Sequence, residues 1–238
     1  SSKGIGLALA RGLGAAGARV VLNSRGTQAL EAAQSSLEAE GVDASFQAFD
    51  VTDPDAVKAG VDAIESRVGA IDILINNAGM QFRTPLQDYP TQTWNLLMRT
   101  NLDSAFFVGQ AVAQHMIERG AGKIINICSV QSELGRPGFA PYAASKGALK
   151  MLTKGMAIDW APHGLHVNAI GPGYFKTELN QALVDDPEFS AWLANRTPAR
   201  RWGNVEELVG AAIFLSSNAS SFVNGHVLYV DGGITSSL

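Results

Sequence analysis

Ile71-Asp72-Ile73-Leu74-Ile75-Asn76-Asn77-Ala78-Gly79 is the stretch that decides the fold class. Its apolar first half has the length and composition of a buried strand, and two amides with a nearby glycine mark its end. Strands buried on both sides are typical of parallel sheets that carry helices on each face. The stretch therefore predicts a central parallel strand that ends at a polar loop.

Strand-like and helix-like stretches alternate on both sides of this strand. The alternation predicts right-handed crossovers and one α/β domain with a doubly wound parallel sheet over residues 1–238, since no linker, repeat or low-complexity segment divides the chain. Residues 174–202 are expected to be irregular, with short helical pieces. The other strands are expected at 19–22, 46–49, 123–127, 165–170 and 227–230, and the helices at 5–16, 27–40, 53–68, 91–119, 141–161 and 205–216.

Polar or turn-forming residues follow five of the predicted strands. Arg25, Asp50, Asn77, Ser129 and Pro172 each lie just beyond the carboxyl end of one of them. Open α/β sheets bind ligands in the crevice outside these ends. The coincidence across five strands is a stronger indication of a binding site than any single motif.

Composition excludes several classes of function. The 238 residues are 46% hydrophobic and 17% charged, as expected for a globular domain with a large core, and the net charge of -4 argues against a nucleic-acid partner. No apolar run is long enough to span a bilayer, so no membrane partner is expected. Cys128 is the only cysteine, which favours the cytoplasm over an oxidising compartment. Four histidines, at positions 115, 163, 166 and 226, lack metal-ligand spacing, and no catalytic metal is expected.

Tyr142 and Lys146 form the candidate for acid–base chemistry. Residues four apart share one face of a helix, so the phenol and the ammonium would point into the same space. A neighbouring ammonium favours the phenolate and lowers the phenol's pKa from its ordinary value near ~10. Ser129 supplies a hydroxyl for a substrate oxygen, and the three together could move a proton on or off it. Taken alone, however, a Tyr-x-x-x-Lys pair is most often an ordinary pair on a helix surface.

Several loops are candidates for a dinucleotide site. The glycines of Lys3-Gly4-Ile5-Gly6 open a helix, whose N–H groups and dipole attract phosphate, although close helix–sheet packing explains them equally. Ser24-Arg25 follows the predicted strand 19–22, where a nicotinamide-binding fold meets the adenosine ribose. An acidic residue there would bind the ribose 2′-OH, whereas arginine suits a 2′-phosphate. No Asp or Glu occupies 22–26, so NADP is favoured and NAD remains possible. Asp50 is a candidate adenine contact, and the loop 76–79 would allow close approach of a ribose, with an Asx turn as the alternative.

Together these residues resemble the short-chain dehydrogenases/reductases over the whole chain. The matching pieces are Lys3-Gly4-Ile5-Gly6, Asp50-Val51, Asn76-Asn77-Ala78-Gly79, Asn101, Ser129, Tyr142-x-x-x-Lys146, Pro172-Gly173 and Tyr229-Val230-Asp231-Gly232-Gly233.

That resemblance implies a Rossmann-like fold, a nicotinamide cofactor and a catalytic tetrad. In this scheme Tyr142 is the acid–base group, Lys146 lowers its pKa and holds the ribose, Ser129 orients the substrate oxygen, and Asn101 supports a proton-relaying water. Without the resemblance, Asn101 would be taken for a locally satisfied helix residue. The implied cofactor contacts are Ser2, Lys3, Gly4, Ile5, Ser24, Arg25, Asp50, Val51, Asn77, Ala78, Gly79, Tyr142, Lys146, Pro172, Gly173, Phe175 and Thr177.

A closer resemblance is to the members of this family that act on sugar acids, carried by residues 81–85, 129–134, 173–177 and 231–234. It implies interconversion of D-gluconate and 5-dehydro-D-gluconate with NADP. A polyol carboxylate needs a cation and several hydrogen-bonding groups, and Arg83, Gln131, Ser129 and Tyr142 could supply them. Gln81, Ser132, Glu133 and Asn180 could address further hydroxyls, and Arg136 is a second candidate cation, or else a solvated loop residue. The alternatives are a 3-oxoacyl thioester reductase or another sugar or polyol dehydrogenase.

Two expectations concern the whole molecule. The family has a first strand, at the middle of the sheet, before the residues that match Lys3-Gly4-Ile5-Gly6, and this sequence lacks it. A truncated sequence is the favoured explanation; a polypeptide that really began at Ser1 would leave an interior position of the sheet empty. Two helices, around Phe106 and Tyr142, are apolar over more than one stripe, which favours oligomerisation. The resemblance implies a homotetramer built on those helices.

Overall fold

Parallel strands form the middle layer of the computed structural model, which describes residues 1–237 (for Leu179 the backbone only). The last residue of the predicted domain, 238, lies outside this description. All strand pairings in the two larger sheets are parallel, as predicted. One sheet has the order β3 (Ile73–Asn76), β4 (Gly122–Ile127), β5 (Leu165–Pro172) and β8 (Val227–Val230), and a second pairs β1 (Val20–Leu22) with β2 (Ala44–Phe46).

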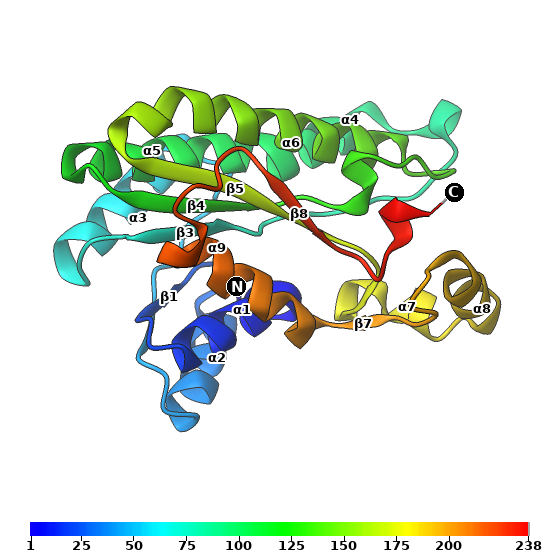
Figure 1. Cartoon of the computed structure of the whole chain (residues 1–238), viewed down its shortest axis with the longest axis horizontal. Helices are drawn as coiled ribbons and strands as arrows, with labels where there is room; N and C mark the ends of the chain where they lie inside the picture. The colour runs from blue at the N-terminus through cyan, green and yellow to red at the C-terminus, as the bar shows by residue number, and fades with distance from the viewer. Residues whose placement is uncertain (238) are drawn as a thin grey trace.

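Helices cover both faces of the four-stranded sheet (Figure 1). None of the helices within residues 1–237 is both long and apolar enough to cross a membrane. On one face lie α3 (Pro54–Arg67), α4 (Thr91–Met98), α5 (Ser104–Arg119) and α6 (Ala140–Trp160), on the other α1 (Gly4–Ala15) and α9 (Val209–Ser216), and α2 (Thr27–Ala39) packs against β2.

The core follows from the alternation of side chains along buried strands. Ile124 of β4 belongs to the apolar cluster under α3, α5 and α6, whereas its neighbour Ile125 packs with Leu9 of α1 on the opposite face. Successive strand residues point to opposite faces, so a strand covered on both sides is mostly apolar. Ile124 and Ile125 are almost fully buried. Each such side chain contributes on the order of 2 kcal/mol through burial.

Three elements differ from their predicted positions. β2 covers Ala44–Phe46 rather than 46–49, and the residues after it form an extended loop. β3 begins at Ile73 rather than residue 71 and is only half-buried. The predicted long helix over 91–119 is interrupted by a π-helical turn at Arg99–Asp103, which separates α4 from α5.

A cleft separates the β1–β2 sheet from the four-stranded sheet. It has a volume of about 830 Å³ and is lined on one side by Val20–Leu22 of β1 and on the other by residues 73–75 of β3. No ladder joins β1 to β3 in the described chain. The cleft explains why β3 is only half-buried, although its sequence predicts a buried strand.

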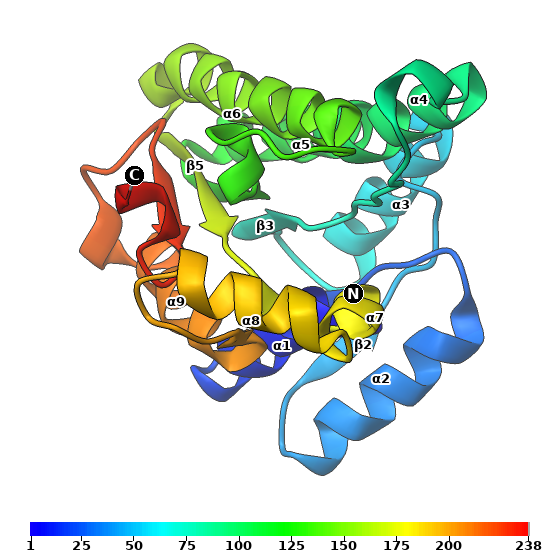
Figure 2. The ribbon, with the colours of Figure 1, turned by 90° about the vertical axis from the view of Figure 1, so that its right-hand side faces the viewer.

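The segment 174–202 lies over the carboxyl ends of the strands (Figure 2). It contains β6 (Phe175–Lys176), α7 (Gln181–Val184) and α8 (Pro187–Arg196), and β6 pairs with β7 (Gly203–Asn204). Asp186 caps α8 by accepting hydrogen bonds from the backbone N–H groups of Glu188 and Phe189. The segment thus has a defined structure of short elements at the edge where the polar residues were expected.

Candidate active site

Tyr142 and Lys146 lie on one face of α6, one turn apart. Pro141 occupies the first turn of this helix, where the missing N–H costs nothing. The Lys146 Nζ atom lies 5.9 Å from the centre of the Tyr142 ring. Lys146 is 4% exposed and its ammonium donates a hydrogen bond of 2.7 Å to the carbonyl of Ile127, at the end of β4. The helix and the strand end together fix the position of the cation.

Burial dominates the acidity of both groups. Desolvation raises the pKa of Tyr142 to about 12, although the hydrogen bond with the Ser129 hydroxyl acts in the opposite direction. Desolvation also lowers the pKa of Lys146 to about 8. The expected lowering of the Tyr142 pKa by Lys146 is therefore not found in this arrangement, because loss of hydration outweighs an ammonium that is directed at the Ile127 carbonyl.

Ser129 and Gln131 follow β4, whose last carbonyl accepts the hydrogen bond from Lys146. Ser129 is buried, and its Oγ accepts a hydrogen bond of 3.1 Å from the Gln131 backbone N–H. Gln131 is 9% exposed, and its Oε1 finds no hydrogen-bond partner among residues 1–237. A buried acceptor without a partner is costly, so the site is suited to a ligand that brings a hydroxyl or N–H group.

Asn101 connects the π-helical turn to the loop after β3. Its Oδ1 accepts a hydrogen bond of 2.7 Å from the Met80 N–H, and its Nδ2 donates to the Met80 carbonyl at 2.9 Å and to Ser145 Oγ at 3.1 Å. These partners are distant in sequence, so the interpretation of Asn101 as a locally satisfied helix residue is wrong. A Cβ on Gly79 would lie 3.5 Å from Asn101 Oδ1 and 3.7 Å from Lys146 Nζ, which places the loop directly beside the tetrad.

The start of α1 is suited to a phosphate. Its N-cap residue Lys3 makes no side-chain capping bond, so the first N–H groups of the helix are available. Gly4 has φ +55 and open space where a Cβ would stand, whereas a Cβ on Gly6 would lie 2.7 Å from Asn77 Nδ2. One glycine therefore keeps the backbone accessible, and the other lets helix and loop approach.

Side chains at two further strand ends suit a 2′-phosphate and an adenine. Arg25 is exposed after β1, next to the half-buried Ser24. The pKa of the Asp50 carboxyl is lowered, first by hydrogen bonds from Thr52 and then by the charges of Arg25 and Arg99. The residues present thus fit a dinucleotide that carries an extra phosphate.

Other predicted cofactor residues face the site through their backbone. The Phe175 side chain is 4% exposed and belongs to the core cluster of Leu9, while Val51 packs against the opposite cluster. Pro172 ends β5, and a Cβ on the next residue, Gly173, would lie 2.7 Å from Asp231 Cα. For these residues only main-chain groups are placed to contact a ligand. Ile5 lies in the first turn of α1, whereas Ser2, Ala78 and Thr177 lie outside helices and strands; all four are half-buried except Ala78, which is exposed.

The candidate substrate residues divide into two groups. Arg83 is exposed and its guanidinium lies 5.7 Å from the Phe139 ring centre, and Gln81 Nε2 lies 3.5 Å from Asn180 Oδ1. Glu133, by contrast, accepts hydrogen bonds from Lys150 and from the Tyr229 hydroxyl, so its carboxylate already has partners.

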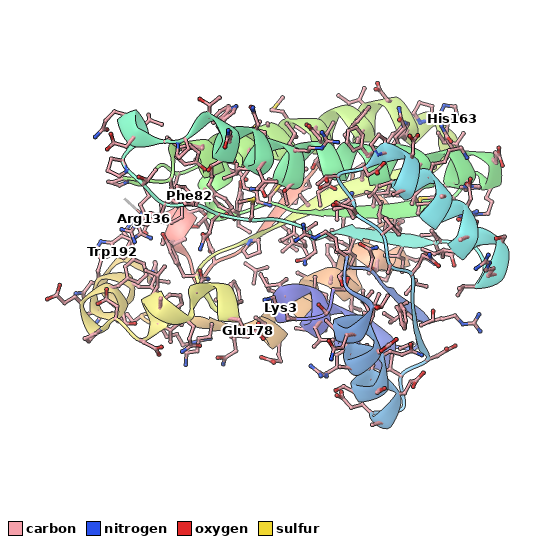
Figure 3. The ribbon with its side chains drawn as sticks, turned by 180° about the vertical axis from the view of Figure 1, so that it is seen from behind. Lys3, Phe82, Arg136, His163, Glu178 and Trp192 are labelled. Atoms are coloured by element: carbon pink, nitrogen blue, oxygen red, sulfur yellow. The ribbon has the colours of Figure 1, made fainter. Side chains whose placement is uncertain are left out.

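Sequence reasoning missed three features of the site. Ser145 is fully buried and its hydroxyl donates to the Tyr142 carbonyl at 2.7 Å; its place three residues after Tyr142 was the available signal. Lys3 forms a salt bridge of 3.4 Å with Glu178, which joins the start of α1 to the 174–202 segment (Figure 3). The third is an aromatic cluster, in which the rings of Tyr174, Phe189, Trp192 and Trp202 pack with centres 5.2 to 6.1 Å apart.

The fold and the site define a class: an oxidoreductase that acts on CH–OH groups. Residues 1–235 match the sequence profile of a family described as enoyl-(acyl carrier protein) reductase. The chain belongs to the short-chain dehydrogenase/reductase family.

Its relatives are named for sugar acids. The chain is 65% identical over 238 residues to gluconate 5-dehydrogenase of Gluconobacter oxydans (strain 621H), covering 100% of this chain and 93% of the relative. It is 54% identical to 5-keto-D-gluconate 5-reductase of Escherichia coli (strain K12), with 98% and 92% covered. A crystal structure of gluconate 5-dehydrogenase from Burkholderia cenocepacia J2315 in complex with NADP and tartrate superimposes with a TM-score of 0.98 at 59% identity, covering 100% of this chain and 93% of the other.

Proposed function

We propose that this protein interconverts D-gluconate and 5-dehydro-D-gluconate, with NADP as its cofactor. The proposal is carried by one observation: Ser129, Tyr142, Lys146 and Asn101 converge beside Gly79, in a chain 65% identical to a gluconate 5-dehydrogenase. The NADP of the Burkholderia cenocepacia complex supports the choice of cofactor.

The side chains divide the chemistry among them. Bound NADP accepts or supplies the hydride. Tyr142 takes the proton from the C5 hydroxyl in oxidation and returns it in reduction, while Ser129 holds the same substrate oxygen. Lys146 supplies positive charge beside the phenol and holds the ribose, and Asn101, fixed by Met80 and Ser145, supports the water through which the proton reaches solvent.

Backbone and side-chain groups at the strand ends would hold the cofactor. Residues 2–5 would bind the diphosphate at the helix terminus, and Ser24 with Arg25 the 2′-phosphate. Asp50 and Val51 would contact the adenine, and Asn77, Ala78 and Gly79 the ribose. The main chain of Pro172, Gly173, Phe175 and Thr177 would face the nicotinamide. For the substrate, Arg83 would meet the carboxylate and Gln131 a hydroxyl, which would satisfy its unpaired Oε1.

The test is an absorbance assay of D-gluconate oxidation with NADP and with NAD. We expect turnover with NADP and a loss of about 10²- to 10⁴-fold in Tyr142→Phe, because the general acid–base group is removed. The thermal midpoint and NADP affinity of the variant should stay close to those of the original protein. Full activity in Tyr142→Phe would contradict the catalytic assignment.

The description of the matching family profile names an acyl-carrier-protein substrate, although for reduction of a C=C bond, and a 3-oxoacyl thioester reductase is therefore kept as the alternative. Reduction of acetoacetyl-coenzyme A, measured beside reduction of 5-dehydro-D-gluconate, separates the two functions. We expect the sugar acid to be preferred, because Arg83 and Arg136 both approach the Phe139 ring that packs against Tyr142, and their charges suit a carboxylate.

We further propose a cytoplasmic homotetramer. The free thiol of Cys128 supports a reducing compartment. Exposed apolar side chains on α4, α5 and α6 support burial of these helices against other subunits. They are Trp94, Leu96, Phe106, Met151 and Ile158. Light scattering coupled to gel filtration would measure the mass, and a monomer at micromolar concentration would contradict the tetramer.

A further inference from the structure

Arg136 lies among aromatic rings from two parts of the chain. Its guanidinium carbon is 5.1 Å from the ring centre of Phe139, the residue before α6, and 4.5, 5.1 and 5.9 Å from those of Phe189, Trp192 and Tyr174 in the 174–202 segment. Cations over aromatic faces are attracted by the ring quadrupole. The rings therefore hold a cation at the boundary between the loop after Ser129 and the segment that covers the site.

Most hydrogen-bond donors of this guanidinium have no protein acceptor. Within residues 1–237 it makes one hydrogen bond, from Nη1 to the Tyr174 hydroxyl at 3.3 Å, and no salt bridge. The side chain is half-buried, so its charge is only partly screened by water. An arginine with five donors in a planar fork matches a carboxylate in two parallel hydrogen bonds. The aromatic rings orient the cation but leave its charge to be neutralised by an anion.

The cation lies beside the reacting group. The Phe139 ring, which Arg136 overlies, packs edge-on against the Tyr142 ring with centres 6.1 Å apart. The Arg83 guanidinium approaches the same Phe139 ring, at 5.7 Å, and has no salt bridge within the described chain. Both guanidinium groups thus approach the Phe139 ring, and neither has a carboxylate partner among residues 1–237. Figure 3 shows Arg136 with Phe82 and Trp192 at one end of the molecule, so the ligand would enter between exposed aromatic rings.

We propose that Arg136 is the specificity-determining residue that binds the carboxylate of the sugar acid, with Arg83 as the second arm of the same clamp. This inference rests on the proposed function and extends it. Tyr142 engages the oxygen on C5, and the carboxylate lies at the far end of the carbon chain, where the two guanidinium groups stand. The aromatic rings fix the Arg136 fork before the substrate arrives, which reduces the entropy lost on binding.

The test compares two ketoses that differ only at the carboxylate. L-Sorbose has a CH2OH group where 5-dehydro-D-gluconate has its carboxylate, and both carry the same carbonyl. We expect Arg136→Leu to lower the ratio of kcat/KM for 5-dehydro-D-gluconate to that for L-sorbose by about 10- to 100-fold, chiefly through KM for the acid. Arg67→Leu, which removes an exposed arginine from α3, is the matched control and should leave the ratio unchanged.

Arg136→Lys keeps the charge and loses the fork, so it should lower the ratio by a smaller factor. It also carries the test if Arg136→Leu does not fold, as judged by its thermal midpoint. An unchanged ratio in folded Arg136 variants, or an equal loss on both ketoses, would overturn the clamp and leave the proposed function intact. A starting protein that reduces neither ketose would overturn the proposed function, and the clamp with it.

Discussion

At the scale of single residues, burial shifts the pKa values of the two central groups of the site. Lys146 and Tyr142 both have pKa values displaced toward their neutral forms, to about 8 and about 12. A charged Lys146 at neutral pH therefore costs folding free energy, which the hydrogen bond to Ile127 offsets only in part. The cost is consistent with a residue kept for catalysis rather than for stability.

The lowered pKa of Lys146 predicts how the stability of the protein depends on pH. The folded pKa of Lys146 is below its unfolded value of 10.5, so above pH 8 the unfolded chain binds one more proton there, and stability rises with pH. Between pH 7 and 9.5 the unfolding free energy of the original protein should rise relative to that of Lys146→Met by about 2 kcal/mol. Guanidinium denaturation at the two pH values measures the difference.

Lys154→Met is the control for this experiment, since Lys154 is an exposed lysine on the same helix. Its unfolding free energy should keep a constant offset from the original protein across the same pH range. Parallel curves for Lys146→Met as well would show that Lys146 has an ordinary pKa.

At the scale of elements, the π-helical turn between α4 and α5 organises the site. The wider π-helical turn directs the Asn101 side chain toward Met80. In a regular α-helix the same side chain would point in another direction. Its side chain satisfies both backbone groups of Met80, in the loop that must remain open for a ligand. The turn thus interrupts the regular helix and, through Asn101, holds the Met80 loop in place.

Asn101→Ala should therefore destabilise the protein as well as the site. Removing the amide leaves two Met80 backbone groups and Ser145 without this partner, at a cost of about 3 kcal/mol in unfolding free energy. Asn95→Ala, at an exposed position on α4, should cost less than about 0.5 kcal/mol. Chemical denaturation compares the two variants, and equal costs would show that the Met80 contacts carry no energy.

Some elements of the fold and the site could be predicted from the sequence, and others could not. Mostly apolar stretches such as 123–127 identified the parallel sheet, because a strand covered on both faces is mostly apolar. The π-helical turn could not be predicted, since no glycine or proline interrupts the helical stretch 91–103. The Arg136 cluster was also out of reach: residues 139 and 189 contact it from segments about fifty positions apart, and no local pattern joins them.

At the scale of the whole molecule, the cleft between β1 and β3 leaves two apolar strand edges without a strand partner among residues 1–237. Residues 1–238 preceded by an apolar strand of about six residues and a Thr-Gly turn should have a higher thermal midpoint and bind NADP more tightly than residues 1–238 alone, because the added strand would fill the cleft. A Gly/Ser extension of equal length is the control. Calorimetry measures both proteins, and an equal midpoint for the two would contradict the idea that the cleft accepts a strand.

The aromatic cluster over the site has an optical consequence. Trp202 is 8% exposed and its indole N–H donates to Ser190 Oγ at 3.0 Å, while Trp192 beside it is 43% exposed. Both indoles belong to the segment that covers the strand ends, and Trp192 contacts Arg136. A displacement of that segment would change the polarity around them, so the emission spectrum of the protein itself would report such a displacement.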